Sequence, residues 1–343
     1  VKFKSAQGNF RIHYDTAGRH AVDDIDLDAN GIPDFVDYTA HYFEEVYSEY
    51  LNMGFESPIP DEGGGGGDEY DIYLMELGKS KVHESSGYYG VTVPSLTYKV
   101  QGRNFVLNKS YIIIDNNYSP YDTTYTTIIN NQGMPDTVSY PTYYSTGYDG
   151  LKVTAAHEFH HSVQYIYGLP DFPLPQASSV HEMVSTYFEH RLYPGVNDYY
   201  QYIQVLFRFI YRDDFAFGNP ETSNGYQWSI FFQYAHHHYG DSLMLRMWEL
   251  VGNDILEYTA LDSAFKERGS SLKDEMCKFT DWLYYTGSRT SDAPPGEHFE
   301  TAGEFPKLRF ANDGQNDTYN GEKLRVMDEV MTFGIKPYRF FLP

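Results

Sequence analysis

One short segment of the chain has the residue types and the spacing of a zinc-binding helix. His157, Glu158 and His161 form the pattern His-Glu-x-x-His. In a helix, His157 and His161 lie one turn apart on one face, where two neutral imidazoles can hold a zinc ion. Glu158 then points toward a water on the metal and is expected to take its proton as the water attacks a carbonyl carbon. His160 points to another face, and we expect it to pack or to support the site.

A catalytic zinc site of this kind needs a third protein ligand. A longer version of the motif supplies a third histidine, but Gln164 and Tyr167 stand where it requires glycine and histidine. Glu182 is the candidate instead, because a glutamate on a following helix completes a His₂Glu set. Two alternatives stay open. Ser179 and Glu182 also form a capping box, which would make Glu182 purely structural, and Glu189 lies two turns further along the same predicted helix.

Acidic and amide side chains recur at fixed intervals in a second segment, residues 26–37. The pattern Asp-x-Asp-x-Asn-Gly-Ile-x-Asp-x-x-Asp matches the spacing of an EF-hand calcium loop, with Gly31 at the sharp turn. An acidic, solvated turn without an ion is the alternative. Calcium is abundant outside cells, so a calcium site also favours a secreted protein. The predicted calcium ligands are Asp26, Asp28, Asn30, Ile32, Asp34 and Asp37.

The composition excludes several kinds of protein. The 343 residues include 25 Lys and Arg against 48 Asp and Glu, which gives a formal net charge of -23. Such a chain repels phosphate backbones, so we expect no nucleic-acid partner. Cys277 is the single cysteine, so neither an intramolecular disulfide nor a thiolate zinc cluster can form. No apolar run is long enough to span a membrane. The oligomeric state cannot be read from the sequence.

The elements that must position these residues change in type along the chain. Strands are predicted at Phe10–Tyr14, Tyr70–Met75 and Ser110–Ile114, and a helix is predicted over Tyr38–Leu51, ending near Gly54. The glycines at 63–67 predict a mobile surface loop. A polar loop at 312–321 and a late strand at 330–341 follow the helical part. Further helices, separated by Gly and Pro, are predicted over 151–167, 180–192, 197–211, 226–238, 242–251, 255–267 and 272–285.

This order of elements predicts an α+β fold with two lobes. The first part, 1–168, is expected to be an α/β lobe with a mixed sheet, the calcium loop and the metal-binding helix. Residues 169–290 form a mostly helical lobe that carries the third zinc ligand. Residues 291–343 form an irregular segment that includes the late strand.

The predicted ligand helix resembles that of the gluzincin metallopeptidases. In aminopeptidase-type members this helix reads close to Asn-Glu-Gly-Phe-Ala-Thr-Tyr-Phe-Glu, and residues 181–189 here read His-Glu-Met-Val-Ser-Thr-Tyr-Phe-Glu. The last four residues coincide, and the resemblance implies a zincin-like fold with Glu182 as the third zinc ligand. Over most of 10–290 the chain also resembles a group of secreted bacterial metalloproteases. The segments that carry this second resemblance are 13–16, 26–34, 70–73, 154–161 and 197–199.

The resemblance also implies further site residues. Gluzincins use a Tyr or His to stabilise the oxyanion that forms on the substrate, and Tyr226, just before a predicted helix, is the candidate. Core packing is the alternative for Tyr226, because the chain has 34 tyrosines. The histidines at 236–238 are a weaker candidate. The strand before the metal helix commonly pairs with an extended substrate in such peptidases, which makes Tyr111–Asp115 the candidate edge.

Together these features predict a secreted zinc metallopeptidase that acts on protein or peptide substrates through a zinc-bound water activated by Glu158. Met183 replaces the glycine usual after the ligand glutamate, and the Gly-Ala-Met-Glu-Asn motif that grips a free amino terminus is absent. An endopeptidase is therefore favoured. The alternatives are a calcium-dependent extracellular binding or adhesion module and a zinc hydrolase of a non-peptide bond. Zn²⁺ and Ca²⁺ are the expected cofactors.

Overall fold

The computed structural model describes residues 1–59, 63–78, 88–129, 135–170, 175–212, 215–217, 225–311 and 334–338. The chain divides into two compact units. The first unit is made of Val1–Asp171 and Phe188–Asp198, and the second of Phe172–Tyr187 and Tyr199–Pro343. The first unit is mixed α/β, and the described part of the second is helical apart from short irregular segments. The fold is therefore mixed α/β, as the order of predicted elements indicates.

A mixed β-sheet forms the framework of the first unit. Its strands lie in the order β1 (Lys2–Lys4), β2 (Phe10–His13), β3 (Tyr70–Met75), β5 (Phe105–Asp115) and β4 (Gly90–Lys99). Strands β2, β3 and β5 run parallel, whereas β1 and β4 pair antiparallel with their neighbours. A short strand β8 (Leu169–Pro170) also pairs with β5, and a separate hairpin contains β6 (Tyr121–Ile129) and β7 (Pro135–Pro141).

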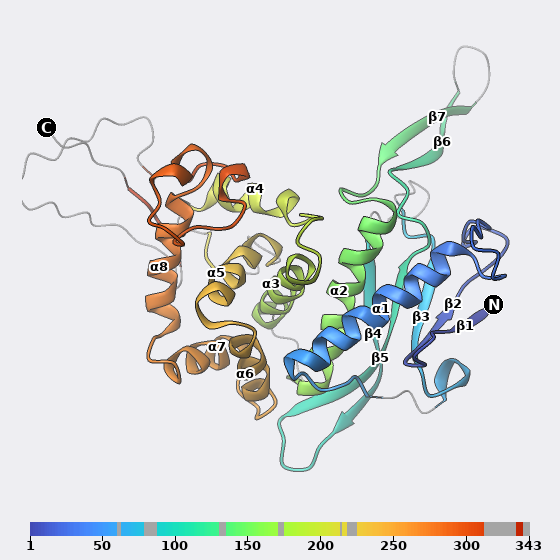
Figure 1. Ribbon diagram of the computed structural model, residues 1–343, viewed down its shortest axis with the longest axis horizontal. Helices are drawn as coiled ribbons and strands as arrows, with labels where there is room; N and C mark the ends of the chain where they lie inside the picture. Colours follow the sequence, from blue (N-terminus) through green and yellow to red (C-terminus); the bar gives the residue numbers. More distant parts are fainter. Residues whose placement is uncertain are drawn as a thin grey trace, which may run out of the picture. The chain divides into compact units, whose positions relative to one another are not determined.

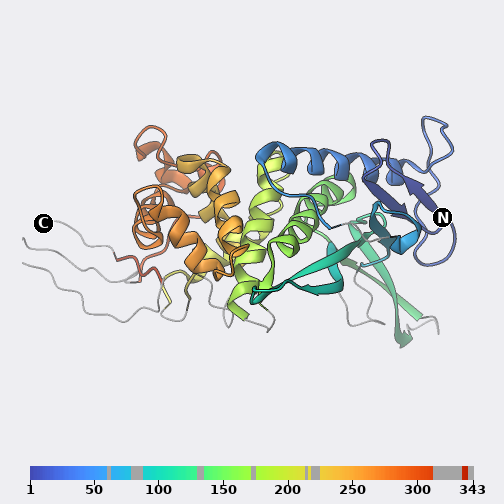
Figure 2. The same ribbon diagram turned by 90° about the horizontal axis from the view of Figure 1, so that it is seen from below.

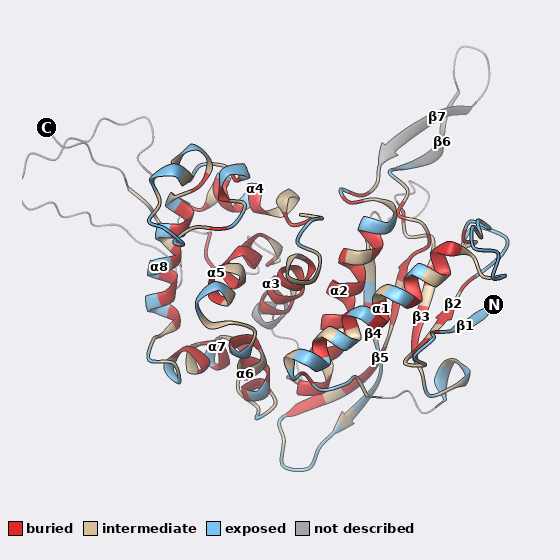
Figure 3. Cartoon of the chain, in the orientation of Figure 1, coloured by how far each residue is buried: buried red, intermediate tan, exposed pale blue. Residues whose placement is uncertain are grey.

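Two helices, α1 (Asp34–Met53) and α2 (Gly147–Tyr167), pack side by side on one face of this sheet (Figures 1 and 2). Phe159 of α2 contacts Phe10 of β2 and Tyr50 of α1, with ring centroids 5.9 and 5.4 Å apart. Most of α2 and β5 is buried (Figure 3). Burial of these aromatic and aliphatic side chains fixes α2, which carries His157, against the sheet.

The glycine-rich segment, 63–67, includes a short 3₁₀ turn that lies against charged side chains, where the sequence indicated a mobile surface loop. A Cβ at Gly65 would overlap the carboxylate of Asp71, and one at Gly67 would overlap the Arg11 guanidinium. Lys4 and Arg11 both bind Glu69 at 2.6 Å, and their hydrogen bonds lower the pKa of Glu69 to about 2. Glycine is favoured at Gly65 because its backbone is left-handed, with φ of 48°, and lies close to the Asp71 carboxylate.

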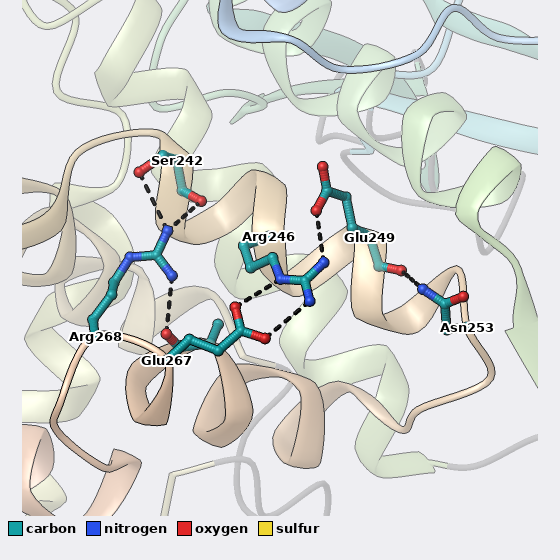
Figure 4. Close-up of polar contacts among 7 residues, drawn as sticks. Ser242, Arg246, Glu249, Asn253, Glu267 and Arg268 are labelled. Atoms are coloured by element: carbon teal, nitrogen blue, oxygen red, sulfur yellow. Dashed lines mark hydrogen bonds and ion pairs between the residues drawn. The ribbon is translucent and has the colours of Figure 1, made fainter.

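The second unit contains the helices α4 (Tyr200–Phe209), α5 (Ser229–Tyr239), α6 (Ser242–Val251), α7 (Glu257–Lys266) and α8 (Leu272–Tyr284). Its core is aromatic, with Trp228, Phe231 and Phe279 all fully buried. Arg246 of α6 reaches Glu267 just after α7 through two hydrogen bonds of 2.7 and 2.9 Å (Figure 4). These pairs are exposed, so the aromatic core rather than the ion pairs supplies most of the stabilisation.

Most of the elements expected from the sequence lie where the pattern placed them. The strands β2, β3 and β5 and the helices α1–α8, α3 (Pro175–Leu192) among them, overlap the expected ranges. Strands β1, β4 and β8 and the β6–β7 hairpin were not predicted from the sequence. The polar loop at 312–321 and most of the late strand at 330–341 lie outside the described residues. In the part of the chain that is described, no helix is long and apolar enough to cross a membrane.

Candidate metal centre

The segment that carries the two spaced histidines is helical, as expected. Helix α2 ends at Gly168, whose backbone N–H donates to the Gln164 carbonyl. His157 and Glu158 are buried, at 8 and 6% exposure, and His161 is half-buried. The spacing of four residues therefore places both imidazoles on one face of a well-buried helix.

The two imidazoles are oriented by hydrogen bonds at their Nδ1 atoms. His157 Nδ1 lies 2.7 Å from Glu189 Oε1, and His161 Nδ1 lies 2.8 Å from Gln164 Oε1. Both neighbours are oxygens, so these contacts favour the neutral tautomer with the hydrogen on Nδ1, in which each Nε2 presents a lone pair. This is the arrangement in which neighbouring groups fix the tautomer of a metal-binding histidine.

The two Nε2 atoms lie close to one another. His157 Nε2 and His161 Nε2 lie 3.1 Å apart. Two nitrogens bound to one tetrahedral zinc at about 2.0–2.1 Å would be about 3.3 Å apart. Facing lone pairs repel unless a cation lies between them, so the geometry fits a metal ion at this place.

A glutamate carboxylate completes the group of possible ligands. Helix α3 (Pro175–Leu192) carries both Glu182 and Glu189. Ligand atoms of His157, His161 and Glu182 all lie within 4.8 Å of one another. Glu189 instead accepts the hydrogen bond from His157 Nδ1. Two imidazoles and one carboxylate are the donor set of a catalytic zinc site, and the residues fit this metal.

Strand β4, which was not predicted from the sequence, contacts Glu158. Thr92 of β4 places its hydroxyl oxygen 2.8 Å from Glu158 Oε2 and 2.8 Å from the Glu158 carbonyl oxygen. Burial raises the pKa of the phenols of Tyr70 and Tyr118, and the negative charge of Glu158 adds to both shifts. Both phenols therefore stay protonated at neutral pH.

His160 lies away from the two spaced histidines, in the aromatic core of the first unit. Its ring lies 4.6 Å from that of Phe188 and 5.7 Å from that of Tyr50, and its side chain is fully buried. This position matches the packing role expected from the sequence.

Tyr226 lies at the start of a 3₁₀ turn, Tyr226–Trp228, that leads into α5. Its ring stacks on Tyr202 with the centroids 4.8 Å apart. The backbone at Gly225 approaches α3 so closely that a Cβ there would overlap the carbonyl oxygen of Ser179. The turn that carries Tyr226 thus packs beside the part of α3 that carries Glu182. In the histidine run, His236 lies 3.0 Å from Asp241, whereas His237 and His238 are exposed.

The expected edge strand is wrong. Residues Tyr111–Asp115 of β5 pair with β4 along one side and, from Ile112 on, with β3 along the other. The described sheet ends instead at β4. Asp115 N–H donates to the Tyr89 carbonyl, and pairs alternate along an antiparallel ladder, so the backbone N–H and C=O groups of Gly90 and Thr92 point to the outer side.

The acidic loop gathers part of its expected ligand set. Carboxylate oxygens of Asp26, Asp28 and Asp34 lie within 4.8 Å of one another. Asp34 begins α1, and its side chain accepts a hydrogen bond from the Leu27 N–H at 3.0 Å. The loop therefore leads directly into a helix, as expected for a calcium loop.

The remaining expected calcium ligands, Asn30, Ile32 and Asp37, form hydrogen bonds with one another. The Asn30 side-chain amide donates to Asp37 Oδ2 at 2.7 Å, and Asn30 Oδ1 accepts from the Ile32 N–H at 2.7 Å. A calcium ion would compete with the amide donor for the Asp37 carboxylate. Asn30 Oδ1 and Asp37 Oδ2 become available to an ion only if the Asn30 side chain turns, whereas Ile32 would offer its backbone carbonyl oxygen.

Two residues around the metal centre were not found from the sequence. Gln164 had been considered only as a departure from a longer motif, although its place three residues after His161 puts it on the same helical side. Thr92 gave no signal, because its contact with Glu158 spans 66 positions of sequence. Comparison with protein-family models and with curated proteins finds no match for this chain.

Proposed function

We propose that the protein is a zinc-dependent peptidase with His157, His161 and Glu182 as the metal ligands. The single observation that carries this proposal is the cluster of His157 Nε2 and His161 Nε2, 3.1 Å apart, with a carboxylate oxygen of Glu182 in the same group of possible ligands. When bound there, zinc supplies a Lewis acid that polarises a carbonyl group and makes water more acidic.

Glu158 acts as the general base in this proposal. It follows His157 directly, and its carboxylate is buried and not part of the His₂Glu set. Its oxygen accepts the proton of the attacking water and delivers it to the leaving amine nitrogen. Tyr226 is proposed to donate a hydrogen bond to the oxyanion from its hydroxyl.

The open side of β4 is the proposed substrate-binding edge. The backbone groups of Gly90 and the backbone N–H of Thr92 point outward there, the Thr92 carbonyl accepts from Tyr165, and the Thr92 side chain contacts Glu158. An extended peptide that pairs with this edge lies next to the general base. An extended edge accepts the middle of a chain as readily as its end, which favours an endopeptidase. Because calcium is abundant outside cells, the proposed calcium loop also leads us to propose that the protein is secreted.

The proposal is tested by metal analysis and by cleavage of an unfolded protein. We expect about one zinc per chain and internal cleavage products on a gel. A chelator should stop the cleavage, and added zinc should restore it. Zinc binding without cleavage of any unfolded protein or peptide library would point to a non-peptide bond. Absence of zinc binding would overturn the proposal altogether.

We also propose that residues 26–37 bind calcium. The support is the gathering of the oxygens of Asp26, Asp28 and Asp34 at the start of α1. A bound ion would neutralise carboxylates that otherwise repel one another within one short loop.

Calcium is therefore expected to raise the melting temperature. At about 100 times its dissociation constant, an ion bound only to the folded state adds roughly 2.7 kcal/mol to the free energy of unfolding. Calorimetry with calcium and with a calcium-selective chelator measures this shift. The double variant Asp26→Ala and Asp28→Ala should erase the response. A wild-type melting curve that ignores millimolar calcium after chelation and dialysis would show that the loop is only an acidic turn.

A further inference from the structure

The strand β4 contacts the proposed general base through two of its residues. Thr92 is buried, and its hydroxyl oxygen lies 2.8 Å from Glu158 Oε2. Gly90, two positions earlier on the same face of the strand, lies so close that a Cβ there would be 2.8 Å from Glu158 Cγ. The Glu158 side chain is thus confined along its stem by Gly90 and at its carboxylate by Thr92.

The position of the Thr92 hydroxyl is itself fixed. It also lies 2.8 Å from the carbonyl oxygen of Glu158, and Tyr165 donates a hydrogen bond to the Thr92 carbonyl at 3.3 Å. Glu158 and Tyr165 both belong to α2, so strand and helix are joined at this residue. A threonine has one rotatable hydroxyl hydrogen, which the two Glu158 oxygens share.

We infer that Thr92 is a positioning residue that holds the Glu158 carboxylate in one orientation. The inference rests on the proposed function, because it assigns Thr92 a role only through Glu158. A general base must lie within hydrogen-bonding reach of the proton it takes, and a side chain with several rotamers spends less time there. The Thr92 hydroxyl removes this freedom on the side of the carboxylate that faces β4.

The location of Thr92 has a second consequence for catalysis. Its side chain touches Glu158, and its backbone N–H points to the outer side of β4, where substrate is proposed to pair, whereas its carbonyl accepts from Tyr165. One residue therefore joins the proposed substrate-binding edge to the general base. A small shift of β4 would move both together.

The test compares Thr92→Val, which removes the hydroxyl, with Thr92→Ser, which keeps it. We expect kcat of Thr92→Val to fall about 10- to 100-fold, as for a catalytic group displaced by about 1 Å, with KM changed less than about threefold. Zinc affinity should stay at the wild-type value in both variants. Thr92→Ser should recover most of kcat. The matched control is Thr290→Val, which removes a hydroxyl that donates to the Gly287 carbonyl in the second unit, and it should behave as wild type.

A double-mutant cycle and a crystal structure separate positioning from general stability. The shorter Glu158→Asp carboxylate cannot keep the same contact, so Thr92→Val should change its kcat little more. In crystals, Glu158 should have one rotamer in wild type and in Thr92→Ser, and more than one in Thr92→Val. A Thr92→Val variant with wild-type kcat and a single Glu158 rotamer would overturn the inference. An equal loss of kcat in the Glu158→Asp background would do the same. If wild-type protein with bound zinc cleaves no peptide, the proposed function fails instead, and the rotamer comparison still tests the contact.

Discussion

Glu158→Gln is expected to keep zinc and to lose peptide hydrolysis. The amide has nearly the shape of the carboxylate and can still accept a hydrogen bond from Thr92, but it cannot take a proton from water. Because Glu158 lies outside the ligand set, the metal content should stay near one zinc per chain. We expect kcat to fall by about 10³-fold or more. Metal analysis and cleavage of a fluorescent peptide measure the two effects on one sample.

The control for this variant is Glu300→Gln, the same change at an exposed glutamate. It should leave both zinc content and kcat unchanged. Peptidase activity at the wild-type level in a zinc-replete Glu158→Gln sample would show that another group takes the proton. The proposed mechanism would then be wrong, even if the metal site is right.

Glu182→Ala is expected to weaken zinc binding far more than Glu189→Ala. Glu182 supplies a ligand atom, whereas Glu189 accepts the hydrogen bond from His157 Nδ1 at 2.7 Å. Loss of a partner behind a ligand typically costs about 10- to 100-fold in metal affinity, and loss of the ligand itself should cost more. Competitive titration with a chelator measures both affinities.

A third variant refines this comparison. Glu189→Gln keeps an oxygen that can accept from His157, so its loss of affinity should be smaller than that of Glu189→Ala. If the two Ala variants rank the other way, Glu189 is the ligand and Glu182 is not. The capping-box alternative does not hold, because α3 begins at Pro175 and Ser179 therefore lies inside the helix and not at its start.

The parts of the site that lie close together in sequence could be predicted, and the distant ones could not. His157 and His161 are four residues apart, so a helix alone brings them together. To predict which strand lies at the edge of the sheet, the strand order must be known. Ile112, Ile113 and Ile114 form an unbroken apolar run, which is typical of a strand with neighbours on both sides and argues against an edge. Strand β4 was not predicted because Pro94 interrupts its sequence. Most side chains of β4 are also exposed or half-buried, so they do not form the pattern expected of a strand.

The calcium loop shows a different limit of sequence patterns. The spacing identified the candidate oxygens but not their competitors. Asn30 has both a donor and an acceptor in its side chain, and its donor faces Asp37. Only the folded loop shows that its hydrogen bonds compete with ion binding.

The glycine-rich segment at 63–67 has a practical consequence for protein engineering. Its sequence looks like a flexible linker, the kind of place usually chosen for an affinity tag or a fused domain. Its backbone, however, lies directly over the Asp71 carboxylate and the pair of Arg11 with Glu69. An insertion at this point would separate the segment from the strands beneath it and expose these charges to solvent. Tags belong elsewhere on the surface, however permissive a run of glycines looks.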